Sequence, residues 1–245
     1  MSDSGAPKYR RVLIKLSGEA FAGELGQGLD YPSIDVIAGE VAALHAMGVG
    51  IAIVVGGGNI VRGRSAAEKG VEQVTGHYMG MLGTVINALA FQDALEKLGL
   101  EVRVQSALPI TAVAEPYIRR RAMRHLEKGR IVIFGSGTGN PYFTTDTAAA
   151  LRASEIGADA ILMGKNGTDG VYDKDPRRNA DAVKFDTITY ADAINRQLKV
   201  MDLTAFTFCM ENNMPIIVFD LNGLGNMARV ARGESIGTLV STKPV

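Results

Sequence analysis

Residues 51–59 read Ile-Ala-Ile-Val-Val-Gly-Gly-Gly-Asn, a run of five apolar residues that ends in three consecutive glycines. A continuous apolar run of this length is typical of a strand that helices cover on both faces, as in a parallel sheet. Three glycines directly after such a strand indicate a loop whose backbone amides a polyanion can approach closely. A tight turn without a ligand would also account for the glycines. The stretch therefore predicts an α/β fold with a candidate anion-binding loop.

The same order of strand, loop and helix recurs along the chain. Apolar spacing predicts one helix that Ser33 caps, a second over roughly 76–98, a third that ends at Leu126, and a fourth that follows the loop 135–145 and runs through Ala148, Leu151, Ser154 and Ile156. The other predicted strands are 12–16, 102–104, 131–134, 160–163, 215–219 and 238–240, the last at an edge of the sheet. This alternation predicts a three-layer α/β/α sandwich around a mostly parallel sheet, in a single domain over residues 1–245.

Composition narrows the class of protein. Lysine plus arginine and aspartate plus glutamate number 26 each, and a chain without net charge is not typical of a nucleic-acid binder. No apolar run reaches the length of a membrane span, and the first residues lack an apolar signal core. The single cysteine, Cys209, excludes an intramolecular disulfide and fits a reducing compartment. We therefore expect a cytoplasmic protein with no nucleic-acid or membrane partner.

Four polar or glycine-rich segments fall at predicted strand ends, where ligands bind in open α/β sheets. In the first, residues 15–18, Lys15 lies within the end of an apolar strand and can bridge phosphates; a snorkelling edge-strand lysine is the alternative. The second joins the three glycines to Arg62, which can bind a phosphate through two parallel hydrogen bonds. The glycine spacings of a dinucleotide fold and of a P-loop are both missing, which disfavours an oxidoreductase.

The third and fourth segments carry hydroxyl, aromatic and acidic side chains. Residues 135–146 read Gly-Ser-Gly-Thr-Gly-Asn-Pro-Tyr-Phe-Thr-Thr-Asp and lead into a helix whose first amides favour an anion. Thr144 or Thr145 would serve equally as an N-cap, and Asp146 as an ordinary first-turn acid. In residues 164–176, Tyr172 offers an aromatic surface to a base, and Asp175 offers a carboxylate to a ribose or to a base edge. A β-turn with charged side chains would account for this loop equally well.

These four segments, in this order, resemble the amino-acid-kinase superfamily over Arg10 to Val240, and within it the bacterial uridylate kinase branch. Residues 138–146 are the most specific part, because acetylglutamate and aspartate kinases of the same fold lack them. The resemblance implies transfer of the ATP γ-phosphoryl group to UMP in pyrimidine nucleotide biosynthesis, with Mg²⁺ bound through the phosphates and no protein metal site. It also implies activation by GTP, inhibition by UTP and a homo-oligomer, typically a hexamer.

The same resemblance assigns roles to individual residues. Residues 1–160 would form the acceptor lobe and 161–245 the ATP lobe. The ATP site would contain Lys15, Leu16, Ser17, Gly18, Gly58, Arg62, Asn166, Tyr172 and Asp175. The UMP site would contain Gly57, His77, Thr138, Gly139, Asn140, Pro141, Tyr142, Phe143, Thr144 and Thr145. The GTP site would contain Gly23, Glu24, Leu25, Gly26, Gln27, Gly28, Arg103 and Arg130. His77 departs from the family, because many relatives carry an aspartate there that binds the UMP ribose; a histidine can still donate or accept a hydrogen bond.

The chemistry of the acceptor explains which catalytic groups are expected. A phosphate oxygen of UMP is already largely ionised near neutral pH, so no general base is required. Lys15 and Arg62 would stabilise the transferring group, and Asp146 would orient Lys15 or the metal shell. Lys165 is a weaker candidate for a second phosphate lysine. Two alternatives stay open: a kinase of the same fold that acts on an acyl or carbamoyl acid, and a nucleotide sensor without turnover.

Overall fold

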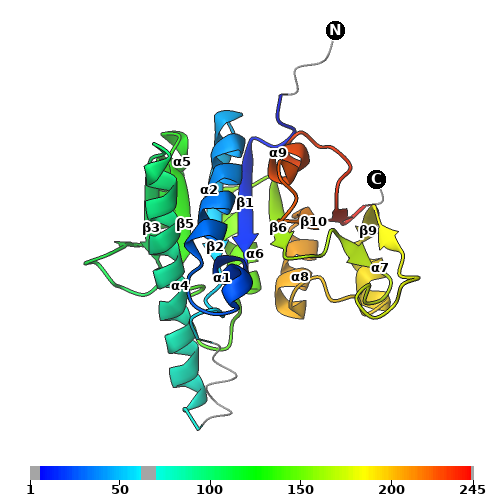
Figure 1. The fold of residues 1–245 in the computed structure, drawn as a ribbon, viewed down its shortest axis with the longest axis horizontal. Helices are drawn as coiled ribbons and strands as arrows, with labels where there is room; N and C mark the ends of the chain where they lie inside the picture. Colours follow the sequence, from blue (N-terminus) through cyan, green and yellow to red (C-terminus); the bar gives the residue numbers. More distant parts are fainter. Residues whose placement is uncertain (1–5, 62–69, 244–245) are drawn as a thin grey trace.

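The structure, a computed structural model, describes residues 6–61 and 70–243 and is built on one nine-stranded sheet (Figure 1). The strand order is β4-β3-β5-β2-β1-β6-β10-β11-β9, and every neighbouring pair is parallel except β10 and β11. The strands are β1 (Arg11–Leu16), β2 (Gly50–Val55), β3 (Val102–Ser106), β4 (Glu115–Pro116), β5 (Ile131–Gly135), β6 (Ala160–Lys165), β9 (Thr187–Thr189), β10 (Ile216–Asp220) and β11 (Thr238–Ser241).

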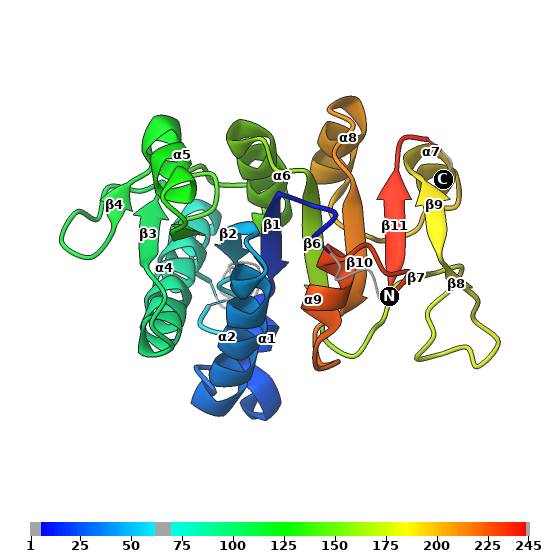
Figure 2. The same cartoon turned by 90° about the horizontal axis from the view of Figure 1, so that it is seen from above.

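Helices cover both faces of this sheet, which confirms the predicted three layers (Figure 2). One face carries α1 (Gly18–Ala22), α2 (Tyr31–Ala46), α4 (Gln73–Lys97) and α9 (Asn226–Ala231). The other face carries α5 (Arg119–Glu127), α6 (Thr145–Ile156), α7 (Tyr190–Asn195) and α8 (Leu203–Glu211). Successive side chains of a strand point to opposite faces, so Val12 and Ile14 enter the first core while Leu13 enters the second. Burial on both faces is the reason why the central strands are apolar throughout.

Three predicted boundaries are wrong, each for a local reason. The helix predicted from Ser33 begins at Tyr31 after Asp30, and the Ser33 hydroxyl lies in its first turn, where it donates to the Asp30 carboxylate at 2.5 Å. Helix α4 begins at Gln73 instead of residue 76, because the Glu72 carboxylate caps it by accepting hydrogen bonds from two amides of the first turn. The sheet edge is β9, because Thr187–Thr189 pairs in parallel outside β11.

The remaining elements lie in two segments. The 3-10 helix η1 (Gly23–Leu25) follows α1, and β7 (Val171–Tyr172) pairs antiparallel with β8 (Lys184–Phe185) beyond the end of β6. Because β1, β2, β5 and β6 are parallel and in register, the loops after them emerge at the same edge of the sheet. That edge carries the candidate site. Within the described ranges, no helix has the length and apolar character needed to cross a bilayer.

Candidate active site

A partly buried ion pair joins the end of a central strand to the start of a helix. Lys15, near the carboxyl end of β1, places its Nζ 2.9 Å from Oδ1 of Asp146 in the first turn of α6. Their side chains are only 12% and 19% exposed. Strand β1 lies between β2 and β6, so Lys15 is not the snorkelling edge-strand lysine that the sequence also allowed. The carboxylate of Asp146 therefore fixes the position of the Lys15 amine near the end of the strand.

Asp202 holds this ion pair in place from the neighbouring helix. Its backbone amide donates to Asp146 Oδ2 at 3.2 Å, and its carboxylate accepts hydrogen bonds from the hydroxyls of Thr144 and Thr147. The other carboxylate oxygen accepts from the Ala205 amide at 2.9 Å and so caps α8. One side chain therefore fixes the starts of both α6 and α8.

Thr144 is the N-cap of α6, one of the two alternatives open from the sequence. Its hydroxyl oxygen accepts from the Asp146 amide at 3.0 Å and from the Thr147 amide at 3.4 Å, while its hydrogen goes to Asp202. The Thr144 hydroxyl therefore donates one hydrogen bond and accepts two, all of them within the protein. Thr145, the first residue of α6, lies beside it at the wall of a cavity.

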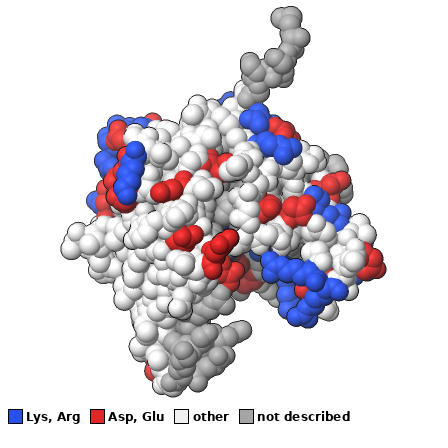
Figure 3. All heavy atoms as spheres, viewed as in Figure 1, with Lys and Arg blue, Asp and Glu red and all other residues white. Residues whose placement is uncertain are grey.

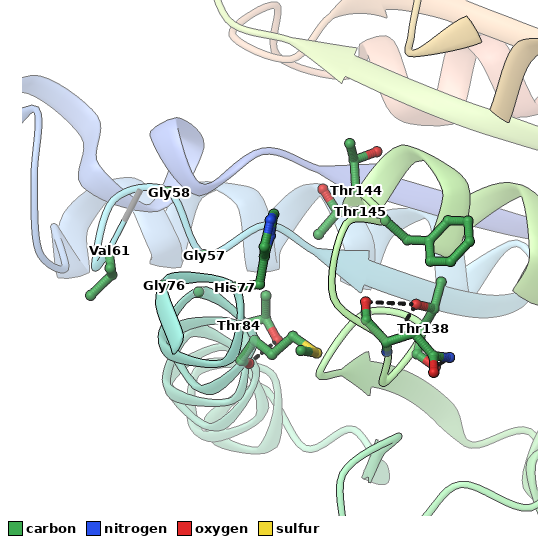
Figure 4. Close-up of a pocket in the computed structure, with 14 residues that line it drawn as sticks. Gly57, Gly58, Val61, Gly76, His77, Thr84, Thr138, Thr144 and Thr145 are labelled. Atoms are coloured by element: carbon green, nitrogen blue, oxygen red, sulfur yellow. Dashed lines mark hydrogen bonds between the residues drawn. The ribbon is translucent and has the colours of Figure 1, made fainter. Parts of the chain in front are cut away.

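That cavity, which we call the acceptor cavity, has a volume of about 290 Å³ and lies between the loop after β2, helix α4 and the loop after β5 (Figure 4). It is lined by Gly57, Gly58, Val61, Gly76, His77, Gly80, Met81, Thr84, Gly137, Thr138, Asn140, Phe143, Thr144 and Thr145. The structure thus brings together most of the residues that the sequence assigned to UMP. Gly139, Pro141 and Tyr142 belong to the same loop but are not in the wall.

His77 rises from α4 into the acceptor cavity, between the glycine loop and Thr145 (Figure 4). Its Nε2 atom is buried and has no hydrogen-bond partner among the residues that the structure describes. Its ring centroid lies 5.0 Å from that of Tyr142, which is a normal distance for an aromatic pair. A buried ring nitrogen without a partner, at the wall of a cavity, is a group that a bound molecule can satisfy.

Two residues of the cavity loop hold left-handed backbone conformations that non-glycine residues rarely adopt. Ser136 has a φ of 61° and Tyr142 a φ of 70°. Ser136 is fully buried; its amide donates to Thr84 Oγ1 at 2.7 Å, and its hydroxyl lies 2.8 Å from that of Ser106. Such strain persists only where surrounding contacts enforce it and is common at ligand sites. The loop is therefore built with a fixed shape.

Two of the three glycines after β2, Gly56 and Gly57, are required by close packing, a reason that the sequence did not reveal. A Cβ on Gly57 would lie 2.5 Å from the Gly80 carbonyl oxygen and 2.8 Å from the Thr84 amide. A Cβ on Gly56 would lie 2.7 Å from the amide of Gly18. The loops after β1 and β2 therefore touch each other, and the second lies against α4 with no room for a side chain.

A second cavity, the donor cavity, has a volume of about 480 Å³ and lies beyond β6. It is lined by Lys165, Thr168, Gly170, Val171, Tyr172, Asp173, Lys174, Asp175, Pro176, Arg196, Gln197, Leu198, Lys199, Val200 and Val218. Tyr172 and Asp175, two of the residues assigned to ATP from the sequence, are in its wall. The stretch 196–200 was missed, because nothing in its pattern marks it as a ligand segment. Figure 3 shows Lys and Arg side chains gathered over this part of the molecule.

Lys165 connects the donor cavity with the ion pair. Its Nζ donates to the Val200 carbonyl at 3.0 Å, and burial, followed by repulsion from Lys15, lowers the pKa of its ammonium group. Asp146 acts in the opposite direction on the same group. The ion pair is thus connected to the acceptor cavity through Thr145, the neighbour of Asp146, and to the donor cavity through Lys165.

Some predicted residues lie elsewhere. Asn166 is not in the wall of the donor cavity; its Oδ1 accepts from Asn222 Nδ2 at 2.7 Å, and it lines a third cavity of about 750 Å³ together with Gly23, Glu24 and Leu25. Its position one residue after β6 turns it toward the opposite side of the sheet edge from Lys165. Arg62 lies outside the described residues.

The two halves of the predicted GTP site do not meet within one chain. Residues 23–28 precede the N-terminus of α2, whereas Arg103 and Arg130 lie at the amino ends of β3 and β5. The residue before Arg130 accepts a hydrogen bond from His45, in the last turn of α2. Since α2 has 16 residues, the two halves are separated by its length, roughly 24 Å.

Comparisons with known proteins agree with this geometry. The profile of the amino acid kinase family matches residues 10–220. The crystal structure of UMP kinase from Bacillus anthracis superposes with a TM-score of 0.94, at 42% identity, and covers 96% of this chain and 97% of that one. UMP kinase from Ureaplasma parvum superposes with a TM-score of 0.90 at 37% identity and covers 96% of this chain and 99% of that one. Uridylate kinase from Archaeoglobus fulgidus superposes with a TM-score of 0.72 at 27% identity and covers 94% of this chain and 99% of that one. A match over most of the chain, with relatives of this identity, leads to one conclusion: the chain belongs to the amino acid kinase family.

Proposed function

We propose that this kinase transfers the γ-phosphoryl group of ATP to UMP and releases UDP and ADP. The observation that carries the proposal is the position of the ion pair between Lys15 and Asp146. On one side, Asp146 directly follows Thr145 in the wall of the acceptor cavity. On the other side, the same pair interacts with Lys165 in the wall of the donor cavity. A cation at this junction can contact the group that passes from one cavity to the other.

The proposed roles follow from the walls of the two cavities. In the N-terminal lobe, Gly57, His77 and the loop 138–145 would hold UMP. In the C-terminal lobe, Tyr172 would stack on the adenine and Asp175 would accept a hydrogen bond from the ribose. Residues 15–18 and Gly58, where the loops after β1 and β2 touch, would surround the phosphates together with Arg62. Asn166 lines the third cavity, so it would contact ATP from that side and not from the donor cavity.

Charge is the main obstacle to this reaction, because two polyanions must approach each other. The acceptor phosphate of UMP is already ionised, so the site needs cations and amide donors more than a general base. Lys15 would stabilise the transferring group, and Asp146 would hold its ammonium in position. In the described part of the chain, no three His, Cys, Asp or Glu side chains form a group suited to a metal ion. Mg²⁺ would therefore be held mainly by the phosphates, whose charge it would neutralise.

The proposal includes regulation and assembly. GTP would activate and UTP would inhibit, and the chain would form a homo-oligomer in which a second copy covers α4. Tyr78, Leu82 and Ile86 recur every four residues of α4 and are 42%, 47% and 45% exposed. Figure 3 shows the surface over α4 as largely uncharged. Such a stripe is suited to contact with the same stripe of another copy. A hexamer, which we propose as the complete assembly, would also allow the separate halves of the GTP site to meet across subunits.

A coupled assay of ADP release tests the function. We expect turnover with ATP and UMP, with weaker turnover for CMP and none for acetylglutamate or carbamate, and we expect GTP to raise the rate and UTP to lower it. Turnover with an acyl or carbamoyl acid but not with UMP would support the other kinase class. Saturable ATP binding without any turnover would support the sensor.

A further inference from the structure

Two asparagine side chains form a closed pair in the interior beside the glycine loop. Asn59 is 4% exposed and Asn87, on α4, is fully buried. Asn87 Nδ2 donates to Asn59 Oδ1 at 2.7 Å, and Asn59 Nδ2 donates to Asn87 Oδ1 at 3.0 Å. Each amide is therefore both donor and acceptor to the other, an arrangement that fixes the orientation of both side chains.

Each amide of the pair also holds one backbone carbonyl. Asn87 Nδ2 donates to the Gly56 carbonyl at 2.6 Å, and Asn59 Nδ2 donates to the Gly28 carbonyl at 2.6 Å. The Gly28 amide donates in return to the Asn59 carbonyl at 2.9 Å. The pair therefore ties three segments together: the loop after β2, the segment between η1 and α2, and the middle of α4.

Burial makes this connection stiff. A polar group that loses its partner in the interior cannot turn to water, so a displacement that breaks one of these bonds is unfavourable. A movement of the backbone at Gly28 must therefore either break the Asn59 contact or move Asn59, which directly follows the three glycines. Because Gly57 and Gly58 line the acceptor cavity, such a movement would alter its wall.

We propose that Asn59 and Asn87 are positioning residues that couple the backbone at Gly28 to the loop Gly56–Gly58, and so to phosphoryl transfer. The coupling would act through the geometry of the loop, because neither asparagine lines the acceptor cavity or the donor cavity. This inference rests on the proposed function, since it is read out through the UMP-dependent reaction.

A substitution at Gly28 can perturb the backbone that Asn59 binds without adding a steric clash. Its φ is +74°, and a Cβ built on it would meet nothing within 4 Å. Gly28→Ala therefore adds backbone strain without a steric clash. Gly48, in the turn after α2, provides a matched control, because its φ is +81°, its Cβ would also meet nothing within 4 Å, and its amide donates to the His45 carbonyl instead of to the asparagine pair.

The experiment is a double-mutant cycle on kcat/KM for UMP at saturating ATP. Gly28→Ala and Gly48→Ala are each made in the wild type and in Asn87→Ala, and thermal melting is followed in parallel. We expect similar losses of melting temperature from the two glycine variants, whereas only Gly28→Ala lowers kcat/KM, by about tenfold, a usual size for coupling between sites. In Asn87→Ala, which is itself slower, the further effect of Gly28→Ala should shrink to less than about twofold.

Additive effects of Gly28→Ala and Asn87→Ala, or equal effects of the two glycine variants on kcat/KM, would overturn the coupling. If Asn87→Ala does not fold, Asn59→Ala takes its place in the cycle. It removes the hydrogen bonds to Asn87 and to the Gly28 carbonyl, and the expected outcome is the same. Failure of the wild type to form UDP would instead contradict the proposed function, so the two failures are distinguishable.

Discussion

Lys15 Nζ and Asp146 Oδ1 lie 2.9 Å apart, although one ends a strand near the N-terminus and the other begins a helix in the middle of the chain. The contact forms because β1 lies beside β2 and β6 in the centre of the sheet and α6 packs across β1 and β2. Asp202 then fixes the carboxylate through its backbone amide. The end of β1 and the start of α6 therefore carry a preorganised charged site, of the kind that the proposed transfer between anionic groups would require.

Lys15→Ala should lower kcat by roughly a hundredfold to a thousandfold, the range for loss of one preorganised donor to a transition state. The KM for UMP should change little, because Lys15 does not line the acceptor cavity. Steady-state kinetics measure both. Lys97→Ala is the control, since Lys97 is exposed and pairs with Asp93 on the far part of α4. Equal losses in turnover and UMP affinity, or no loss, would remove Lys15 from the catalytic role.

Asp202→Ala should lower the free energy of unfolding by about 1–2 kcal/mol, because it removes the cap of α8. It should also raise the KM for UMP, since Thr144 loses the partner that fixes the start of α6. Denaturant unfolding and steady-state kinetics check the two effects. Asp192→Ala, which removes a similar contact to Thr189 at the start of α7, should leave the KM unchanged. An unaltered KM in Asp202→Ala would show that the network serves stability alone.

Gly57→Ala and Gly39→Ala should change stability in opposite directions. A Cβ on Gly57 would lie 2.5 Å from the Gly80 carbonyl oxygen, so α4 or the loop must shift, and we expect a loss of about 1–3 kcal/mol together with loss of activity. A Cβ on Gly39 meets nothing within 4 Å on α2, and alanine there should add about 0.5–1 kcal/mol. Thermal and denaturant melting measure both. A stabilising Gly57→Ala would contradict the packing seen between the loop and α4.

Cys209 should be unreactive in the folded protein. Burial raises the pKa of its thiol from 9.0 to about 12, so at about pH 8.5 the reactive thiolate is scarce in the folded state. Iodoacetamide should modify the unfolded chain in guanidinium much faster than the native one, as mass spectrometry can measure. Equal rates in the two states would mean that the side chain is accessible.

The same shift predicts how stability depends on pH. Well below pH 9 the thiol is protonated in both states, and its contribution to stability is complete. As pH rises through about 9 and toward 12, the unfolded state releases the proton first, so the free energy of unfolding falls. Burial likewise raises the pKa of Tyr117 from 10.0 to about 12 and adds to the fall. Denaturant unfolding at a series of alkaline pH values should show a shallower slope for Cys209→Ala. An identical slope would contradict the contribution of the thiol.

Charged residues on the exposed stripe of α4 should dissociate the oligomer. The double variant Leu82→Asp and Ile86→Asp would place two carboxylates in an apolar contact between copies, where burying them is unfavourable. Light scattering after size-exclusion chromatography should show a smaller mass than for the wild type. Val113→Asp, on an exposed loop, is the control and should keep the wild-type mass. An unchanged mass for the double variant would place the subunit contact elsewhere.

Much of the site could be predicted because it depends on local pattern. Lys15 stands in an apolar strand, where a lysine is unusual, and residues 138–146 carry their glycines and hydroxyls in one uninterrupted stretch. Other features had no such signal. The edge strand Thr187–Thr189 is too short and too polar to be recognised, and Asn59 and Asn87 are unremarkable until the fold buries them against each other.

The sequence by itself determined the layers, the parallel sheet and the edge at which the loops emerge, because these follow from the period and length of apolar runs. Only the tertiary structure decided which side chains meet: Lys15 with Asp146, Asn59 with Asn87, and Asn166 with Asn222 away from the donor cavity. Such contacts join residues far apart in the chain. They depend on strand register and on how helices pack across the sheet, and neither is encoded in any one local stretch.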